Sequence, residues 1–187
     1  MLSSAAKEYL KVYGVLVGKK PLVFTNNDSG YETAIEFKKN GIDPIVLDTR
    51  ENPNSELVNQ ALNMKIDVKF SHVVVAAKGY KKVKSADIAL ISKNKKDLSN
   101  IQNIKCDCIC VSGFWTPTIH LASQSGGKTK FKEEIDAFIP TDSKQNETTL
   151  GSANGIFNLE ETLKTSIEKS FEISNKITNK NQKISVP

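Results

Sequence analysis

The chain has 187 residues and a formal net charge of +5, with 39% apolar and 25% charged residues. This composition is typical of a globular domain with its own core, and no apolar run approaches the ~20 residues that a membrane-spanning helix needs. We expect no membrane partner, no signal peptide and a cytoplasmic protein.

The positive charge does not indicate a nucleic-acid-binding protein. Arg50 is the only arginine, and the lysines are scattered along the sequence. Recognition of phosphates and base edges favours arginine side chains and clustered basic residues. We therefore expect no nucleic-acid partner.

The amino-terminal part of the sequence alternates between helical and strand patterns. The expected elements are a helix over residues 3–13, a strand over 21–25, a helix over 29–40, a strand over 42–49 and a helix over 55–65. This order predicts a parallel sheet with right-handed crossovers.

The pattern changes after residue 67. Residues 68–93 alternate and turn at Lys78-Gly79, which predicts an antiparallel meander, and the polar stretch 94–103 predicts a surface loop. A buried strand is expected within 105–113, and a short helix around 119–123. The weaker strands are expected over 134–140 and 148–152, before a long helix over 159–176.

These elements predict an α/β fold: a Rossmann-like three-layer core with a parallel sheet and an antiparallel three-strand insert. The order is that of the inner, pyridine-nucleotide-type domain of two-domain flavoprotein oxidoreductases. We expect an inner FAD/NAD(P)-type dinucleotide-binding-like domain over residues 1–150. Residues 151–176 would form a strand, loop and helix through which the chain returns to a flavin-type domain. Residues 177–187 would form a frayed tail.

Three stretches carry a closer resemblance. "YLKVYGVLVGKKPLVFTNNDSGYETA", "CDCICVSGFWTPTIHLASQSGGK" and "GSANGIFNLEETL" together resemble the α subunits of heterotetrameric sarcosine oxidases. The resemblance covers most of residues 1–170, and such α subunits are several times longer than this chain. The chain is therefore expected to be either a piece or a short form of such a subunit.

The resemblance implies a role in a bacterial flavoenzyme that oxidises the N-methyl group of sarcosine. Its products would be glycine, hydrogen peroxide and, with tetrahydrofolate, methylene-tetrahydrofolate. It implies NAD bound to the whole α subunit, FMN held between α and β, and substrate oxidation on the β subunit's flavin. The partners would be the other subunits and the rest of α, so this chain alone should be inactive, and it should self-associate through apolar patches.

The loop after the first strand is an eroded phosphate-binding loop. Dinucleotide folds place glycines at its first, third and sixth positions, where this chain has Thr25, Asn27 and Gly30. Ser29 can cap the following helix, whose free N–H groups can still bind an anion. Asp48 ends the second strand, where a carboxylate would hold a ribose hydroxyl or simply pair with Arg50. We favour a retained scaffold with a weakened or lost NAD site over a working one.

A second glycine loop follows the predicted short helix. Its candidate residues for a flavin phosphate or a subunit contact are Ser125, Gly126, Gly127 and Lys128, because backbone amides and an ammonium can converge there on an anion. The alternative is a flexible hairpin. His120 either belongs with this loop or makes a structural hydrogen bond.

The remaining motifs favour structural interpretations. Phe114 and Trp115 are expected to pack at a core or domain junction. Asn154 lies in "GSANG", where flavin-binding relatives carry an aspartate, so polar loop filler is favoured over cofactor binding.

The cysteines also favour a structural interpretation. Cys106, Cys108 and Cys110 are expected on one face of a strand as buried free thiols, with neither a disulfide nor a metal site.

No catalytic constellation emerges from the sequence, and we expect no catalytic residue in this chain. Besides the sarcosine oxidase reading, two alternatives stay open. The chain could be an independent small NAD-dependent oxidoreductase, or a non-catalytic protein-interaction module derived from a dinucleotide-binding domain.

Overall fold

The computed structural model describes residues 1–92, 94 and 97–178, and the chain forms two compact units. The first unit is Met1–Phe114 and the second is Trp115–Pro187. Within the described residues, every helix is too short or too polar to cross a membrane.

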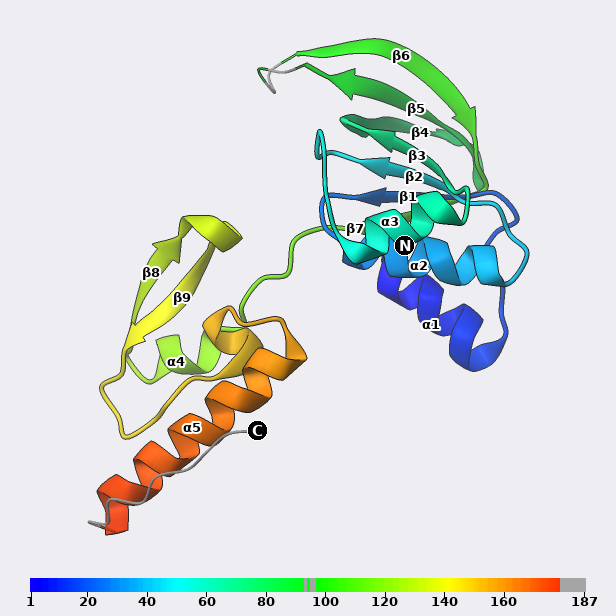
Figure 1. The fold of residues 1–187 in the computed structure, drawn as a ribbon. Coiled ribbons are helices and arrows are strands. Elements are labelled where there is room, and N and C mark those ends of the chain that lie inside the picture. Colours follow the sequence, from blue (N-terminus) through cyan, green and yellow to red (C-terminus); the bar gives the residue numbers. More distant parts are fainter. Residues whose placement is uncertain (93, 95–96, 179–187) are drawn as a thin grey trace. The chain divides into compact units, whose positions relative to one another are not determined.

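A four-stranded parallel sheet lies at the centre of the first unit. Its strands are β1 (Pro21–Thr25), β2 (Ile45–Asp48), β3 (Asp67–Phe70) and β7 (Cys108–Ser112), in the order β3-β2-β1-β7 (Figure 1). All of its neighbouring strands pair in parallel. β1, β2 and β7 are short, mostly apolar runs because both faces of the sheet are covered, whereas the edge strand β3 alternates polar and apolar residues.

Helices cover one face of this sheet and an antiparallel sheet covers the other. The helices are α1 (Ser3–Tyr13), α2 (Ser29–Lys39) and α3 (Glu56–Asn63), and the antiparallel strands are β4 (His72–Gly79), β5 (Val83–Ile91) and β6 (Leu98–Lys105), in the order β4-β5-β6. Val23 and Val46 point into the cluster that includes the helices, while Leu22 and Leu47 pack with Ile88 of β5. The predicted three-layer α/β fold with an antiparallel three-strand insert is confirmed.

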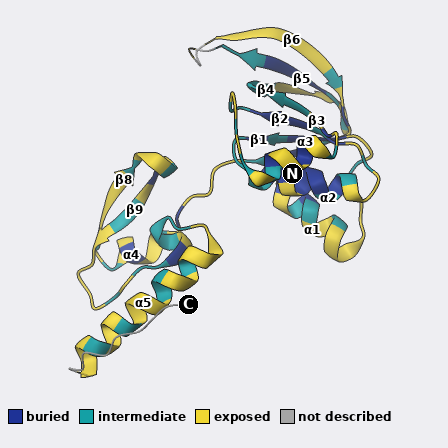
Figure 2. Ribbon diagram, viewed as in Figure 1, coloured by how far each residue is buried: buried dark blue, intermediate teal, exposed yellow. Residues whose placement is uncertain are grey.

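Most of the core lies in α2 and the central strands (Figure 2). Tyr31, Phe37 and Leu22 are fully buried, and complete burial of such a side chain contributes about 1.5–3 kcal/mol.

The predicted cap by Ser29 is wrong, because Ser29 is the first residue of α2 and Asp28 holds the N-cap position without a side-chain hydrogen bond. Two other helix ends carry the usual signals. Gly14 ends α1 in a left-handed conformation (φ 63°), and the Ser55 hydroxyl accepts the Val58 N–H at 3.4 Å before α3.

The antiparallel insert differs from the expectation in its boundaries. The stretch predicted as the first part of the meander supplies β3, which joins the parallel sheet beside β2. The stretch predicted as a surface loop supplies β6 from Leu98 onwards, paired with β5. β6 is an edge strand with almost every residue exposed. Its polar sequence is typical of a loop, but it is also compatible with an exposed edge strand.

The cysteines do not share one face. Cys108 and Cys110 pack on the helix side of the sheet, whereas Cys106 packs in the cluster beneath the antiparallel sheet. A bend at Asp107 separates them, because its carboxylate accepts the backbone N–H groups of the loop before β1. All three cysteines are free thiols.

The second unit is built from short elements and one long helix. They are α4 (His120–Gln124), β8 (Lys128–Lys132), η1 (Glu133–Ile135), β9 (Ala137–Asp142), η2 (Gly151–Asn154) and α5 (Leu159–Thr178). β8 and β9 form an antiparallel hairpin. None of the 20 residues of α5 is buried, so this unit has little core of its own.

Three expectations for the second unit are corrected. Lys128, predicted as part of a glycine loop, instead begins β8, because residues 128–132 pair with β9. The strand predicted over 134–140 starts only at Ala137, after a 3₁₀ turn. The strand predicted over 148–152 is absent from the described chain, where Gly151 instead begins a 3₁₀ turn at a φ of 60° that favours glycine.

The long helix extends to Thr178, so residues 177–178 of the predicted tail are helical. Residues 179–187 lie outside the described residues.

Candidate functional site

The first candidate site lies at the carboxyl ends of β1 and β7. The strand order reverses between these two neighbours, with β2 and β3 on one side of β1 and β7 on the other. Open parallel sheets bind ligands at such a switch point. Thr25 ends β1 and Asn27 lies in the loop after it, while Ser29 and Gly30 are the first two residues of α2.

Gly30 is required for close packing of α2 on β1. A Cβ at this position would lie 2.6 Å from both Cβ and Oγ1 of Thr25. Thr25 Oγ1 also organises the loop, because it donates to the Asn27 carbonyl at 2.7 Å and accepts the Asn27 N–H at 3.2 Å. The glycine that remains therefore has the packing role expected of the third glycine in a dinucleotide loop.

The Asn27 side chain occupies hydrogen-bonding positions across the switch point. Its Oδ1 accepts the Ser29 backbone N–H at 2.9 Å and the Ser29 hydroxyl at 2.6 Å. Its Nδ2 donates to the Gly113 carbonyl, which follows β7. The Ser112 hydroxyl lies 3.3 Å from Asn27 Oδ1 and 2.8 Å from Ser29 Oγ. A side chain of the protein thus satisfies the N–H at the start of α2 that an anion would otherwise accept from.

Asp48, at the end of β2, is fully buried and engaged by its own chain. The Tyr31 hydroxyl donates to its Oδ2 at 2.7 Å. Arg50 donates to the carboxylate from its backbone N–H at 2.9 Å, from Nε at 3.0 Å and from Nη2 at 2.8 Å. Arg50 Nη2 also lies 2.8 Å from Asp28 Oδ1, so the guanidinium links the end of β2 to the residue that precedes α2.

Burial and these contacts change the pKa values of Tyr31 and Arg50. Burial first, and then the hydrogen bond to Asp48, raise the pKa of the Tyr31 phenol well above its usual value. Burial alone would lower the pKa of Arg50, but its hydrogen bonds to Asp48 and Asp28 raise it further, so the guanidinium stays charged. Asp48 therefore supports the fold through a charged, hydrogen-bonded pair.

The second candidate set surrounds a hollow of about 340 Å³ in the second unit. The hollow is lined by Ala122, Pro140, Thr141, Asp142, Ser143, Glu147, Thr148, Thr149 and Asn154. Asn154, which was predicted as loop filler or a cofactor contact, is one of its walls. Ser125 reaches the same region, because its hydroxyl lies within hydrogen-bonding distance of the Glu147 carboxylate and of the Ala122 carbonyl, one of which accepts its proton.

The glycines beside this hollow are there for backbone geometry. A Cβ on Gly127 would lie 2.7 Å from the Ala122 carbonyl oxygen and 2.8 Å from that of Asp142, and Gly126 has a φ of 82°. Lys128 starts β8 opposite Asp142 and is exposed. The lining contains carboxylates and hydroxyls but no lysine among the described residues, so its charge does not match the phosphate that the sequence suggested.

The aromatic and histidine candidates lie apart from these contacts. Trp115 is 56% exposed and its ring centroid lies 6.4 Å from that of Phe157, while Phe114 is 61% exposed. His120 is exposed at the start of α4. Within the described residues, no group of three or more His, Cys, Asp or Glu side chains is placed to hold a metal ion.

Sequence reasoning anticipated the Asp48–Arg50 pair but missed its partners. Tyr31 has the spacing of an apolar-face residue of α2, and nothing in the sequence indicates that its hydroxyl reaches Asp48. Ser112 ends the last parallel strand and Gly113 directly follows it. That position marks the edge of the sheet where loops meet, and it was the one available signal.

No protein-family profile matches the sequence, but individual proteins do. Sarcosine oxidase subunit alpha of Corynebacterium sp. (strain U-96) is 30% identical over 166 residues, which is 88% of this chain and 17% of that protein. The subunit of the same name from Rhizobium meliloti (strain 1021) is 29% identical over 154 residues, which is 82% of this chain and 14% of that protein. The chain thus spans less than a fifth of the curated relatives it matches, and the resemblance seen in the sequence is confirmed.

Solved structures support the fold. Thioredoxin reductase from Lactococcus lactis superposes with a TM-score of 0.59 at 16% identity, covering 76% of this chain and 47% of that one. Thioredoxin reductase from T. acidophilum superposes with a TM-score of 0.56 at 13% identity, covering 81% of this chain and 51% of that one. These levels of identity establish a shared fold only.

Proposed function

We propose that this chain, a relative of one segment of sarcosine oxidase subunit alpha, forms the inner dinucleotide-binding-like domain of such a subunit and acts there as a scaffold. The complex would oxidise sarcosine to glycine in the cytoplasm, with hydrogen peroxide and methylene-tetrahydrofolate as further products. This chain alone would have no turnover. Its domain would extend over residues 1–150, and residues 151–176 would return to the rest of the subunit.

The observation that carries the scaffold proposal is the hydrogen bonding of Asn27. Its amide bridges Ser29, at the start of α2, to Gly113, after β7. A pyrophosphate at this switch point would have to displace both contacts, and the replacement of a satisfied internal bond by a ligand bond brings little net gain. The loop is therefore better suited to holding the strands and α2 together than to binding NAD.

The engagement of Asp48 supports the same proposal. A ribose hydroxyl would need a carboxylate oxygen that is free to accept, whereas both oxygens of Asp48 accept from Tyr31 and Arg50. The carboxylate is also fully buried. NAD would then bind elsewhere in the complete alpha subunit, and FMN at its interface with the beta subunit.

Assembly and activity test this proposal together. The tagged chain is co-expressed with the beta subunit of sarcosine oxidase, and a thioredoxin reductase of similar fold serves as the control bait. We expect the beta subunit to co-purify with this chain only, and the chain alone to release no peroxide from sarcosine. Sarcosine oxidation or amine-dependent NAD reduction by the chain alone would instead identify an independent oxidoreductase. Failure to co-purify would favour an unrelated interaction module.

A further inference from the structure

A second hollow opens at the opposite end of the parallel sheet, at the amino ends of β1, β2 and β3. Its volume is about 550 Å³, within the roughly 300–1,000 Å³ typical of small-molecule sites. It is lined by Lys19, Lys20, Pro21, Gly41, Ile42, Asp43, Pro44, Ile45, Lys65, Ile66, Asp67 and Lys105. We call it the amino-end hollow. The candidate site at the switch point uses none of these residues.

The charge of the amino-end hollow is positive. Its two carboxylates are neutralised from outside the lining, because Lys38 pairs with Asp43 and Lys69 lies 3.7 Å from Asp67. The four lining lysines make no ion pair with any described residue. Several unpaired lysines around one concavity give it a positive potential, which favours the binding of an anion.

The floor of the hollow is apolar and its rim is held by hydrogen bonds. Ile42 and Ile45 are half-buried and supply the accessible apolar surface of this floor, while the lining residues Pro21, Pro44 and Ile66 are buried. The Asp107 carboxylate accepts the backbone N–H groups of Lys19 and Lys20, each at 2.8 Å. Two of the rim lysines are thus fixed in their backbone positions, so the hollow is largely preformed.

Helix dipoles do not account for all of this charge. The carboxyl ends of α2 and α3 meet the same edge of the sheet, and cations there offset their partial negative charge. Lys38 and Lys39 lie in the last turn of α2, and Lys65 follows α3. Lys19 and Lys20 belong instead to the loop before β1, and Lys105 ends β6.

We propose that the amino-end hollow binds a small organic anion, one that carries a phosphate or carboxylate group on an apolar body. The lysines would bind the charged group, and the half-buried Ile42 and Ile45 of the floor would bind the apolar part. Such a site is independent of the scaffold role proposed above, because it uses the other end of the sheet.

Phenyl phosphate is the probe, titrated into the ¹⁵N-labelled chain at low salt and followed by amide chemical shifts. We expect the shifts to concentrate on residues 19–20, 41–45 and 65–67. Inorganic phosphate should bind at least several-fold more weakly, because it has no apolar body. The double variant Lys65→Gln/Lys105→Gln should raise the dissociation constant about tenfold, a change typical of losing charged contacts.

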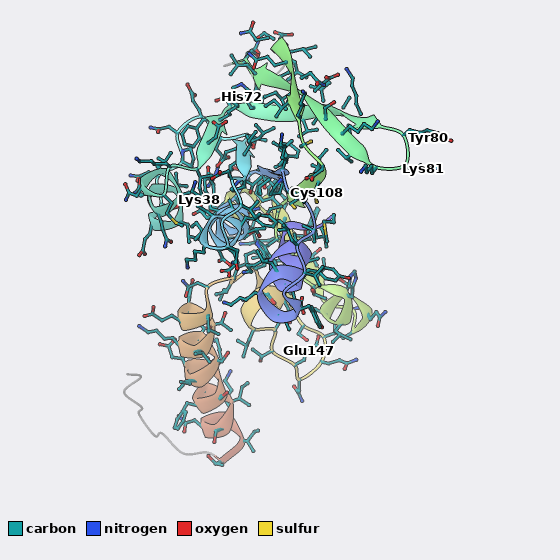
Figure 3. All side chains as sticks on the ribbon, turned by 90° about the vertical axis from the view of Figure 1, so that its right-hand side faces the viewer. Lys38, His72, Tyr80, Lys81, Cys108 and Glu147 are labelled. Carbon is teal, nitrogen blue, oxygen red and sulfur yellow. The ribbon has the colours of Figure 1, made fainter. Side chains whose placement is uncertain are left out.

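The matched control is Lys81→Gln/Lys82→Gln, which removes the same charge at the tip of the β4–β5 hairpin. Figure 3 shows Tyr80 and Lys81 projecting at that tip, and neither Lys81 nor Lys82 lines the amino-end hollow. The control should change the dissociation constant less than twofold. Equal losses of phenyl phosphate affinity in both double variants would mean non-specific attraction by net charge. Equal affinities for inorganic phosphate and phenyl phosphate would mean that the apolar floor does not contribute to binding. Absent or scattered shifts would leave the lysines as helix-end counter-charges, and each of these results overturns the proposal.

Discussion

Replacing Arg50 by methionine tests whether the Asp48 carboxylate belongs to the fold. In the native chain Asp48 is fully buried and accepts hydrogen bonds from Tyr31 and Arg50. In the variant, Asp48 keeps only the Tyr31 hydroxyl and the backbone N–H of residue 50. Breaking a buried ion pair typically costs about 3–5 kcal/mol, because it leaves an uncompensated charge.

The expected loss lies at the lower end of that range. The Arg50 side chain is 32% exposed, so water can replace part of its contact with the carboxylate. We expect the free energy of unfolding of Arg50→Met to fall by about 3 kcal/mol, which corresponds to about 6–12 °C in melting temperature for a chain of this size. Urea and thermal unfolding followed by circular dichroism measure both quantities.

Lys38→Met is the matched control, because it also breaks a lysine- or arginine-to-aspartate pair. Asp43, its partner, is 83% exposed, and such surface pairs contribute about 0–1 kcal/mol. If Arg50→Met lost no more stability than Lys38→Met, the Asp48 pair would not support the fold. The carboxylate would then be available to a ligand, and our reasoning about the site would be refuted.

Further predictions concern three other positions. Tyr31→Phe should make the free energy of unfolding less sensitive to alkaline pH. Since the pKa of Tyr31 is raised in the folded chain, its contribution to stability is complete below about pH 10 and falls by about 1.4 kcal/mol per pH unit above it. In urea titrations above pH 10, the stability difference between wild type and variant should therefore narrow or reverse. Gly30→Ala should lower the free energy of unfolding by about 1–3 kcal/mol through overpacking, since its Cβ would lie 2.6 Å from Thr25 of β1. Gly113→Ala, whose Cβ would have no atom within 4 Å, should lower it less in the same assay, and equal losses would contradict the packing role of Gly30. Cys108 should be alkylated by iodoacetamide at a lower pH than an ordinary thiol, because its hydrogen bond with Cys110 lowers its pKa, whereas the same hydrogen bond and burial raise the pKa of Cys110. Cys110 should therefore stay unmodified, and mass spectrometry of the labelled peptides would refute this if both thiols react alike.

The fold could be predicted where apolar periodicity and tertiary burial agree. The strands at Pro21–Thr25 and Ile45–Asp48 are fully enclosed, so their sequences are short apolar runs between turn residues. The edge strand Leu98–Lys105 pairs on one side only and stays exposed, so it carries no such signal. The segment over 148–152 has β-branched residues but no partner strand among the described residues. Its β propensity alone therefore gave a wrong strand prediction.

The site could be predicted only in its local part. The pairing of Asp48 with Arg50 joins residues two positions apart and follows from sequence alone. The bond from Asn27 to Gly113 joins residues 86 positions apart, and it forms because β1 and β7 become neighbours after the antiparallel insert. The sequence places Asn27 in a weakened phosphate-binding loop. Only the structure shows that its own side-chain amide makes the hydrogen bonds to Ser29 and Gly113 that occupy the position of a bound phosphate.

Calorimetric titration of the purified chain with NAD tests the central claim most directly, with FAD and FMN run beside it. The account predicts no measurable heat of binding for NAD, because Asn27 and Asp48 are already bonded within the fold. Micromolar NAD binding that Asp48→Asn weakens would contradict it, and would make the eroded loop a working cofactor site.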